Sequence, residues 1–233
     1  MAAIFRREFS SYFTSPIGYI FLTVFYFFSG IFFNSVVSSN STDVTPVFGS
    51  LFLVLLVLIP LLTMRLMSEE KKQKTDQLLL TSPVSLSGLV YGKFLAAFCI
   101  YAMGIAVTLV YAVVLAGFAS PQWMVIAGNI LGALLLGFAM ISIGIFISSL
   151  TENQMIAAVG TFAVMLFIYL MDAFSGWIGV KWVSNVLMSI SFMTRYSEFT
   201  SGILNFSTVL YFLSIGVIFN FLTVRVLEKR RWS

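Results

Sequence analysis

The side chains able to do chemistry are few, and many of them lie in one internal segment, "MRLMSEEKKQKTDQLLLTSPVSLSGLVYGK", from Met64 to Lys93. The chain has no histidine, which is the commonest general base and metal ligand in proteins. Its single cysteine, Cys99, lies in an apolar run, where a thiol usually acts as a small apolar side chain. We therefore expect neither a metal site nor a catalytic acid–base pair.

Phosphate binding is the remaining chemistry to consider. The nearest approach to a phosphate-binding loop is "GLVYGKF", from Gly88 to Phe94. It has one residue too few between its glycines, and neither Ser nor Thr follows Lys93. Such a loop also needs a preceding strand, whereas this segment opens an apolar run. We interpret it as the start of a membrane helix with Lys93 among the lipid headgroups, so the chain has no nucleotide site of its own and is not an enzyme.

The composition is typical of an integral membrane protein. Apolar residues make up 60% of the chain, charged residues only 9%, and the mean hydropathy is +1.02; a soluble domain has about 25% charged residues. Six stretches can cross a bilayer, and all must be helical because an open strand would leave its backbone unpaired in lipid. The predicted fold is an all-α polytopic membrane protein. We expect one domain, 1–233, with spans at about 17–37, 47–66, 89–118, 123–150, 154–171 and 208–226.

Lysine and arginine predict the orientation of these spans. If the spans alternate in direction, eleven of the 13 Lys and Arg residues fall on one side and only Lys181 and Arg195 on the other. The positive-inside rule then makes both termini and the Met64–Lys93 segment cytoplasmic. Because the basic residues cluster at membrane boundaries, the net charge of +4 indicates orientation in the cell membrane rather than nucleic-acid binding.

The first residues, Ala2–Thr14, predict an amphipathic helix on the inner leaflet. One side of this helix would be apolar and the other polar, and Glu8 is the exception to this pattern. An ordinary basic flank to the first span is the alternative, whereas a cleaved export signal is disfavoured because the next apolar run exceeds the roughly 7–15 residues of a signal core. The apolar side would consist of Ile4, Phe5, Phe9, Tyr12 and Phe13, and the polar side of Arg6, Arg7, Ser10, Ser11 and Thr14.

The middles of the spans carry no ionisable carboxylate, Lys or Arg, since Lys93, Asp172 and Arg225 lie near span ends. Ion-coupled carriers usually need buried charges for their relay, so this pattern argues against such a carrier. Some glycines have the spacing that lets helices approach closely. These are the pair Gly128 and Gly132 and the pair Gly88 and Gly92.

The Met64–Lys93 segment predicts an ordered cytoplasmic loop. Residues "SEEKKQK" can continue the second span as a helix, since Glu and Lys are good helix formers. Thr75 can then cap a short helix with Asp76 in its first turn, Ser82-Pro83 ends that helix, and Ser85 can cap the third span. The apolar "QLLL" patch suits docking onto a cytoplasmic partner. A solvated loop that holds the topology through its lysines fits these residues equally well.

Resemblance to a known family favours the docking interpretation. The stretch "EEKKQKTDQLLLTSPVSLSGLVYGK" resembles the loop of ABC-2 type permeases, the membrane subunits of ATP-binding-cassette transporters. Two positions depart from the family pattern: Lys74 stands where it usually has Gly, and Asp76 where it usually has Glu. The stretches "FRREFSSYFTSPIGYIF", "ISIGIFISSLTENQMIA", "ISFMTRYSEFTSGILN" and "VRVLEKRRW" are similar to the gliding-motility-type subfamily. The matching loop positions are Glu70, Thr75, Leu78, Leu79, Pro83, Val84, Ser85, Gly92 and Lys93.

The resemblance implies a transporter built from separate parts. Two six-span subunits would form an export pathway across the membrane lipid. They would be either two copies of this chain or this chain and a related permease. Two cytoplasmic ATPase subunits would bind ATP with Mg and hydrolyse it. Members of the subfamily usually work beside a companion protein with a large extracytoplasmic domain. The alternatives are an ion-coupled carrier or channel, and a membrane scaffold subunit without a transport pathway.

The resemblance also assigns roles to residues. A coupling helix at about Lys74–Ser82 would dock on the ATPase through Leu78 and Leu79, while Lys71, Lys72 and Lys74 would lie nearer the headgroups and contribute little. The ATPase-contacting residues of this loop would be Glu69, Glu70, Thr75, Asp76, Leu78, Leu79 and Pro83, and Glu152 would form a second contact in the next cytoplasmic turn. The outer gate would lie within residues 172–207 and include Trp177, Trp182 and Arg195.

Overall fold

The computed structural model describes residues 1–74, 85–118, 122–175 and 190–231, and these residues form helices joined by short turns, without a strand. The predicted all-α fold is confirmed for the part of the chain described. The helices are α1 (Ala2–Thr14), α2 (Pro16–Ser38), α3 (Thr45–Thr63), α4 (Arg65–Lys72), α6 (Leu86–Ala116), α7 (Trp123–Leu150), α8 (Gln154–Ser175), α10 (Phe192–Thr200) and α11 (Phe206–Arg231).

Six helical segments of the described residues are long and apolar enough to cross a membrane: α2, α3 continued by α4, α6, α7, α8 and α11. They confirm the six predicted spans, and α4 confirms that the second span continues as a helix through "SEEKK", whereas Gln73 and Lys74 form a turn. Local signals explain where the helices begin. Pro16 occupies the start of α2, where its missing N–H is not needed, and Ser85 Oγ accepts a 3.3 Å hydrogen bond from the Gly88 amide at the start of α6.

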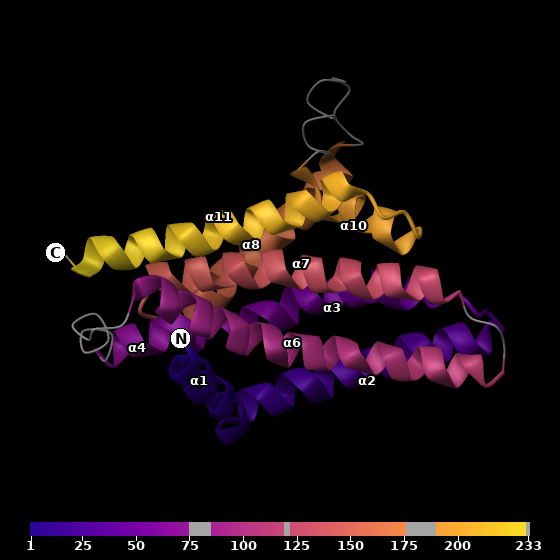
Figure 1. Ribbon diagram of the computed structural model, residues 1–233, viewed down its shortest axis with the longest axis horizontal. Coiled ribbons are helices and arrows are strands. Elements are labelled where there is room, and N and C mark those ends of the chain that lie inside the picture. The colour runs from indigo at the N-terminus through magenta and orange to yellow at the C-terminus, as the bar shows by residue number, and fades with distance from the viewer. Residues whose placement is uncertain (75–84, 119–121, 176–189, 232–233) are drawn as a thin grey trace.

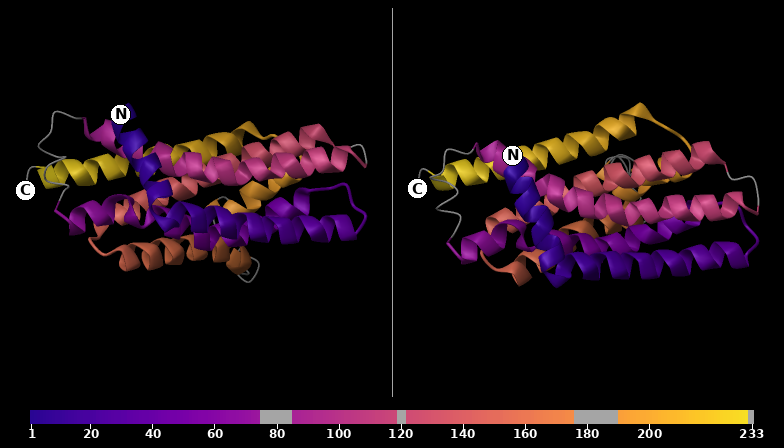
Figure 2. Two further views of the ribbon diagram at one scale, coloured as in Figure 1. Left: turned by 90° about the horizontal axis from the view of Figure 1, so that it is seen from below. Right: turned by 60° about the horizontal axis from the view of Figure 1, so that its bottom comes forward.

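The bundle has central and peripheral helices (Figures 1 and 2). In the most apolar part of the α3–α4 span and of α7, 61% of the residues are buried inside the chain, against 22% in α2 and α11 and 17% in α8. The central helices therefore pack against protein on most sides. The peripheral helices turn most of their apolar side chains outward, where lipid tails are as apolar as the side chains themselves.

Both chain termini lie at one end of the bundle together with α4, and we call this end the α4 end (Figure 1). Helix α1 lies across the α4 end and packs against α6 and α2. The turn between α2 and α3 lies at the opposite end (Figure 2). This arrangement is the one that six spans of alternating direction require.

Helix α1 has the bounds predicted from the sequence. Ile4, Glu8 and Tyr12, which are one helical turn apart, face the bundle, and Tyr12 Oη donates a 2.8 Å hydrogen bond to the backbone oxygen of Leu62. The three phenylalanines of α1 contact one another in series along the neighbouring face. A Cβ at Gly92 would lie 3.0 Å from Ile4 Cγ2, so the glycine lets α1 approach α6 closely, as its spacing predicts.

Glycines on α7 allow similarly close contacts inside the bundle. A Cβ at Gly132 would lie 2.6 Å from Phe199 of α10, and one at Gly137 would lie 2.1 Å from the ring of Tyr101. Further along α7, a Cβ at Gly144 would lie 2.3 Å from Thr63 Oγ1 at the end of α3. Helix α7 therefore packs against α10, α6 and α3 at distances that any larger residue would prevent.

Candidate functional site

At the α4 end, a lysine of α6 is buried between carboxylates from two other helices. Lys93 is 1% exposed, and its Nζ lies 3.1 Å from Glu8 Oε1 of α1 and 2.9 Å from Glu70 Oε1 of α4. Arg7 closes the group on the solvent side, with its Nη2 2.6 Å from the same two oxygens. Two cations and two carboxylates thus form one neutral group, which we call the Lys93 cluster.

The charges of the Lys93 cluster stabilise one another. Burial alone would raise the pKa of Glu8, but the charge of Lys93 and the hydrogen bonds from Arg7 and Lys93 outweigh burial, so the pKa lies below its ordinary value. Burial would also lower the pKa of Arg7, yet the contacts with Glu8 and Glu70 raise it overall. The stabilisation from Glu8 is complete above the ordinary carboxyl pKa of about 4.3 and is lost as the pH falls through the lower pKa of the folded state.

The Lys93 cluster corrects one sequence interpretation and explains an exception. Lys93 does not lie among lipid headgroups, as its position at a span end predicts, because two carboxylates neutralise it inside the protein. Glu8 breaks the two-sided pattern of α1 because it lies on the face that packs against α6, where it pairs with Lys93. The cluster therefore fixes α1 and α4 to the first turns of α6.

A second correction concerns Lys71. The sequence predicts that Lys71 lies near the headgroups and contributes little, but its side chain is buried and its Nζ donates to the backbone oxygen of Ser149 at the end of α7. Lys72 and Lys74 are exposed. One lysine of the "KKQK" run thus holds α4 against α7, whereas the other two point away from the bundle.

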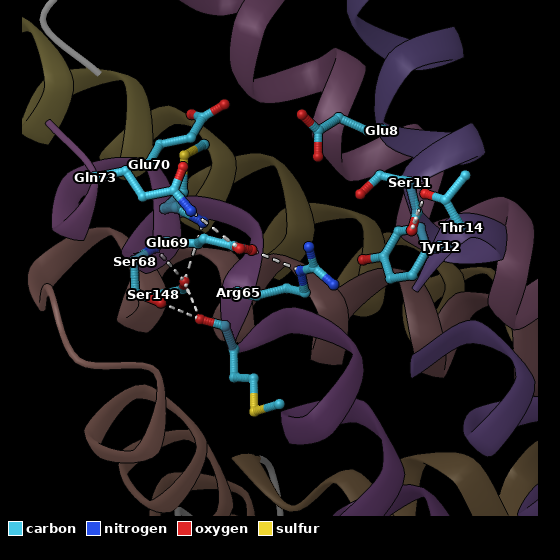
Figure 3. Close-up of polar contacts among 12 residues, drawn as sticks. Glu8, Ser11, Tyr12, Thr14, Arg65, Ser68, Glu69, Glu70, Gln73 and Ser148 are labelled. Carbon is cyan, nitrogen blue, oxygen red and sulfur yellow. Dashed lines mark hydrogen bonds and ion pairs between the residues drawn. The ribbon is translucent and has the colours of Figure 1, made fainter. Parts of the chain in front are cut away.

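A polar cavity of about 310 Å³ lies beside the Lys93 cluster, between α1 and α4. Figure 3 shows Glu8 and Ser11 on one side of this space and Arg65, Glu69 and Glu70 on the other. Arg65 Nε donates a 2.7 Å hydrogen bond to Glu69 Oε2 within α4. The charges around the cavity balance, so it does not favour a ligand of one sign; it forms part of a joint between helices. Its lining consists of Arg7, Glu8, Ser11, Arg65, Glu69, Glu70, Gln73 and Lys93.

The predicted ATPase-contacting residues divide into two groups. Glu69 and Glu70 lie on α4, where Glu69 pairs with Arg65 and Glu70 belongs to the Lys93 cluster. Their contact with an ATPase stays a prediction. The others on this loop lie outside the described residues, as does most of the predicted coupling helix: Thr75, Asp76, Leu78, Leu79 and Pro83.

The residue that ends the described part of this loop has an unusual backbone. Lys74 has a φ of +56°, in the left-handed region that favours glycine. Its amide donates a 3.1 Å hydrogen bond to the backbone oxygen of Lys71, which closes the turn after α4. This is the position where the resembling permeases usually have Gly. The chain therefore keeps the turn that a glycine would form and accepts the strain of a lysine there.

The second predicted contact also lies at the α4 end. Glu152 is exposed in the turn between α7 and α8, and its Oε1 accepts a 3.0 Å hydrogen bond from Arg230 near the end of α11. Asn153 begins α8 by accepting a 2.9 Å hydrogen bond from the Met155 amide through its side chain. The turn is therefore ordered by a cap on one side and by the C-terminal helix on the other.

The predicted outer gate is described only in part. Trp177 and Trp182 lie outside the described residues. Arg195 lies on α10, 3.8 Å from Glu198 and with its guanidinium 5.7 Å from the ring centre of Tyr211 in α11. The described part of this segment includes the short helix α10. Its role as a gate stays a prediction.

A family model described as "ABC-2 family transporter protein" matches residues 50–231. The chain belongs to the ABC-2 transporter family. No curated protein matches the chain. Membership means that this multi-pass membrane protein is a membrane transport subunit of an ABC transporter, not itself the catalytic part, and it implies a cytoplasmic ABC ATPase as partner. It favours this function over the alternatives of an ion-coupled carrier or channel and of a scaffold without a pathway.

The pairing within the Lys93 cluster is one feature of this ABC-2 permease that sequence reasoning misses. Glu8 and Lys93 are 85 positions apart, and no local pattern joins them. The available signal was Glu8 itself, an acidic residue on the apolar side of an otherwise two-sided helix. A charge in such a place usually has a buried partner, because an unpaired buried charge is expensive.

The burial of Lys93 leads to a prediction about stability. Replacing Lys93 with Met removes the buried positive charge that lies between the Glu8 and Glu70 carboxylates, and we expect a loss of about 3 kcal/mol in the free energy of unfolding. The matched control is Arg225→Met, which breaks an exposed pair with Glu228 and should cost at most about 1 kcal/mol. Denaturant unfolding of the purified permease in detergent measures both. Equal costs for the two variants would contradict a buried, coupled cluster. Adding Glu70→Gln to Lys93→Met removes one of the two carboxylate charges and should recover part of the lost stability.

The backbone of Lys74 leads to a second prediction. Lys74→Gly should raise the free energy of unfolding by about 0.5–1 kcal/mol, because glycine adopts a positive φ without strain. Lys72→Gly, at the last residue of α4, should instead lower it by up to about 0.5 kcal/mol, because Lys72 has a helical backbone and glycine there relieves no strain. Thermal unfolding of the two variants side by side measures the signs. The conformation assigned to Lys74 is wrong if both variants are destabilised.

Proposed function

We propose that this chain is the membrane-spanning permease of an ABC exporter, driven by a separate cytoplasmic ATPase that docks at the α4 end. The observation that carries this proposal is the Lys93 cluster, which joins α4 to α1 and α6 just before the chain enters the predicted coupling segment. A helix held on two sides can pass a displacement of that segment to the membrane helices. A helix end held only by lipid could not.

The α4 end is the cytoplasmic end in this proposal. Eleven of the 13 Lys and Arg residues belong to the segments at this end, namely α1, α4 with the turn after it, the start of α6 and the end of α11. Such a bias is the usual mark of the cytoplasmic side. Both termini are then cytoplasmic, and the turn between α2 and α3 faces outward.

The residues of the α4 end have different tasks in this proposal. Leu78 and Leu79 are the apolar anchors on the ATPase, supported by Thr75, Asp76 and Pro83, which shape their short helix. Glu69 belongs to the same contact. Glu70 holds α4 in place, because its carboxylate already pairs with Arg7 and Lys93. Glu152 provides the second contact, from an exposed turn at the same end.

The other parts of the transporter follow from family membership and from the resemblance to the gliding-motility-type subfamily. The pathway forms between two permease subunits, either two copies of this chain or this chain and a related permease, and a molar-mass measurement of the purified complex distinguishes these stoichiometries from a single subunit. A companion protein with a large extracytoplasmic domain assembles outside. The ATPase supplies the site for ATP and Mg. The segment with Trp177, Trp182 and Arg195 forms the outer gate.

The first 49 residues belong to the same domain in this proposal, although the family model begins at residue 50. Helix α1 packs against α6 and α2, and α2 packs against α3 and α6. Two of the four charges of the Lys93 cluster also come from α1. These contacts support one domain over residues 1–233.

The proposed orientation predicts a labelling pattern. In a Cys99→Ser background, Thr42→Cys and Lys72→Cys place single exposed thiols at opposite ends of the bundle. A membrane-impermeant thiol reagent added to intact cells should label position 42 and leave position 72 unlabelled until the membrane is opened. Labelling of position 72 in intact cells would reverse the orientation, and labelling of both would contradict the six-span arrangement.

The proposed docking predicts which changes abolish ATPase recruitment. Leu78→Asp combined with Leu79→Asp should abolish it while the permease stays inserted, because burying each Leu contributes roughly 1.5–3 kcal/mol. The control is Lys72→Gln combined with Lys74→Gln, since both lysines are exposed and exposed pairs contribute only about 0–1 kcal/mol. Pull-down of the ATPase from membranes with matched permease levels measures recruitment. Wild-type recruitment by the Asp pair would mean that this loop only anchors the topology.

A further inference from the structure

The helix that carries α4 is interrupted where it leaves the bundle. Helix α3 ends at Thr63 and α4 begins at Arg65, with Met64 between them. Pro60 lies one turn earlier inside α3 and has no amide hydrogen to donate. The hydroxyl of Thr63 donates back to the Ile59 oxygen at 2.9 Å, a contact that often bends helices. Several local causes of a break thus coincide in two turns of helix.

The backbone groups at this break are bound by side chains from other helices. Tyr12 of α1 donates to the Leu62 oxygen at 2.8 Å. Ser148 of α7 donates to the Met64 oxygen at 2.9 Å and accepts from the amides of Met67 and Ser68, each at 3.2 Å. Figure 3 shows Ser148 beside Ser68 at this point. One hydroxyl therefore binds both an oxygen and two amides of the first turn of α4, as an N-cap does, but from a different helix.

Helix α7 is shaped to bring this hydroxyl into place. Gly144 lies one turn before Ser148, and a Cβ there would lie 2.3 Å from Thr63 Oγ1. Its missing side chain lets α7 approach the break closely enough for Ser148 to reach the backbone. One residue later, the Ser149 oxygen accepts from Lys71 near the other end of α4. Helix α4 is thus attached to the last turn of α7 at both of its ends.

We propose that Ser148 is a positioning residue that docks α4 on the end of α7 at the Met64 break, so that α4 and the α7–α8 turn move as one body. The α7–α8 turn carries Glu152, and α4 leads into the predicted coupling segment. Without the Ser148 hydroxyl, two buried amides and one oxygen at the break lose a partner, and the break becomes a loose hinge. The importance of this joint for ATPase coupling rests on the function proposed above. The existence of the joint does not depend on that function.

Hydrogen exchange of the purified permease in lipid nanodiscs tests the joint without an ATPase. Ser148→Ala should make peptides covering α4 exchange about tenfold faster, while peptides from α6 and α11 keep their wild-type rates. Ser148→Thr keeps a hydroxyl, so α4 should exchange slowly as in the wild type. Ser148→Val has the shape of the Thr variant but no hydroxyl, so α4 should exchange as fast as in the Ala variant. The matched control is Ser149→Ala, because among the described residues the Ser149 hydroxyl bonds within α7, to the Phe146 oxygen.

A distance measurement tests whether the two segments move together. Spin labels at Lys72→Cys and Glu152→Cys, in a Cys99→Ser background, should give one narrow distance distribution in the otherwise wild-type chain and a broad one with Ser148→Ala. Unchanged α4 exchange, equally faster exchange in all helices, or a narrow distribution in both proteins would each overturn the proposal. If the Ala variant fails to fold, the comparison of the Thr and Val variants decides the question. These outcomes are independent of the pull-down with the Leu78 and Leu79 variants, so failure of one proposal leaves the other standing.

Discussion

A buried positive charge must be neutralised inside the protein, and at Lys93 this requirement determines the geometry of the whole α4 end. Removing an ammonium group from water costs several kcal/mol unless carboxylates approach it closely. The nearest carboxylates come from α1 and α4, so both helices are held against α6. The crossing of α1 over the end of the bundle, the polar cavity beside it and the inward direction of Glu70 all follow from this constraint.

Features that depend on neighbouring residues could be predicted from the sequence, and features that depend on distant ones could not. The bounds of α1 and α7, the extension of the second span and the cap at Ser85 follow from apolar length, helix propensity and capping chemistry, all of which act within a few residues. The direction of the Lys71 side chain could not be predicted in this way, because both a buried and an exposed lysine fit an amphipathic run. Its burial depends on the contact with α7. The same holds for Ser148, whose partners lie 80 to 84 positions earlier in the chain.

The departures from the family pattern have physical meanings of different kinds. Lys74 has the backbone conformation that a glycine adopts without strain, although the residue best suited to that conformation is absent. The part of the chain before residue 50 lies outside the family match, yet α1 contributes two of the four charges at the α4 end. Charge pairs and hydrogen bonds to backbone atoms therefore link the segment outside the match to the segment inside it.

The order of these charges along the chain also bears on biosynthesis. A ribosome makes Arg7 and Glu8 first, Glu70 next and Lys93 last, so both carboxylates exist before the ammonium group that they are to neutralise. Until Lys93 emerges, the group lacks one positive charge, and α1 can contact α2, α3 and α4 but not α6. When the third span enters the membrane, its one charged residue finds its counter-ions already made. The docking of α1 against α6 therefore has to wait for the third span, although α1 is the first helix to be translated.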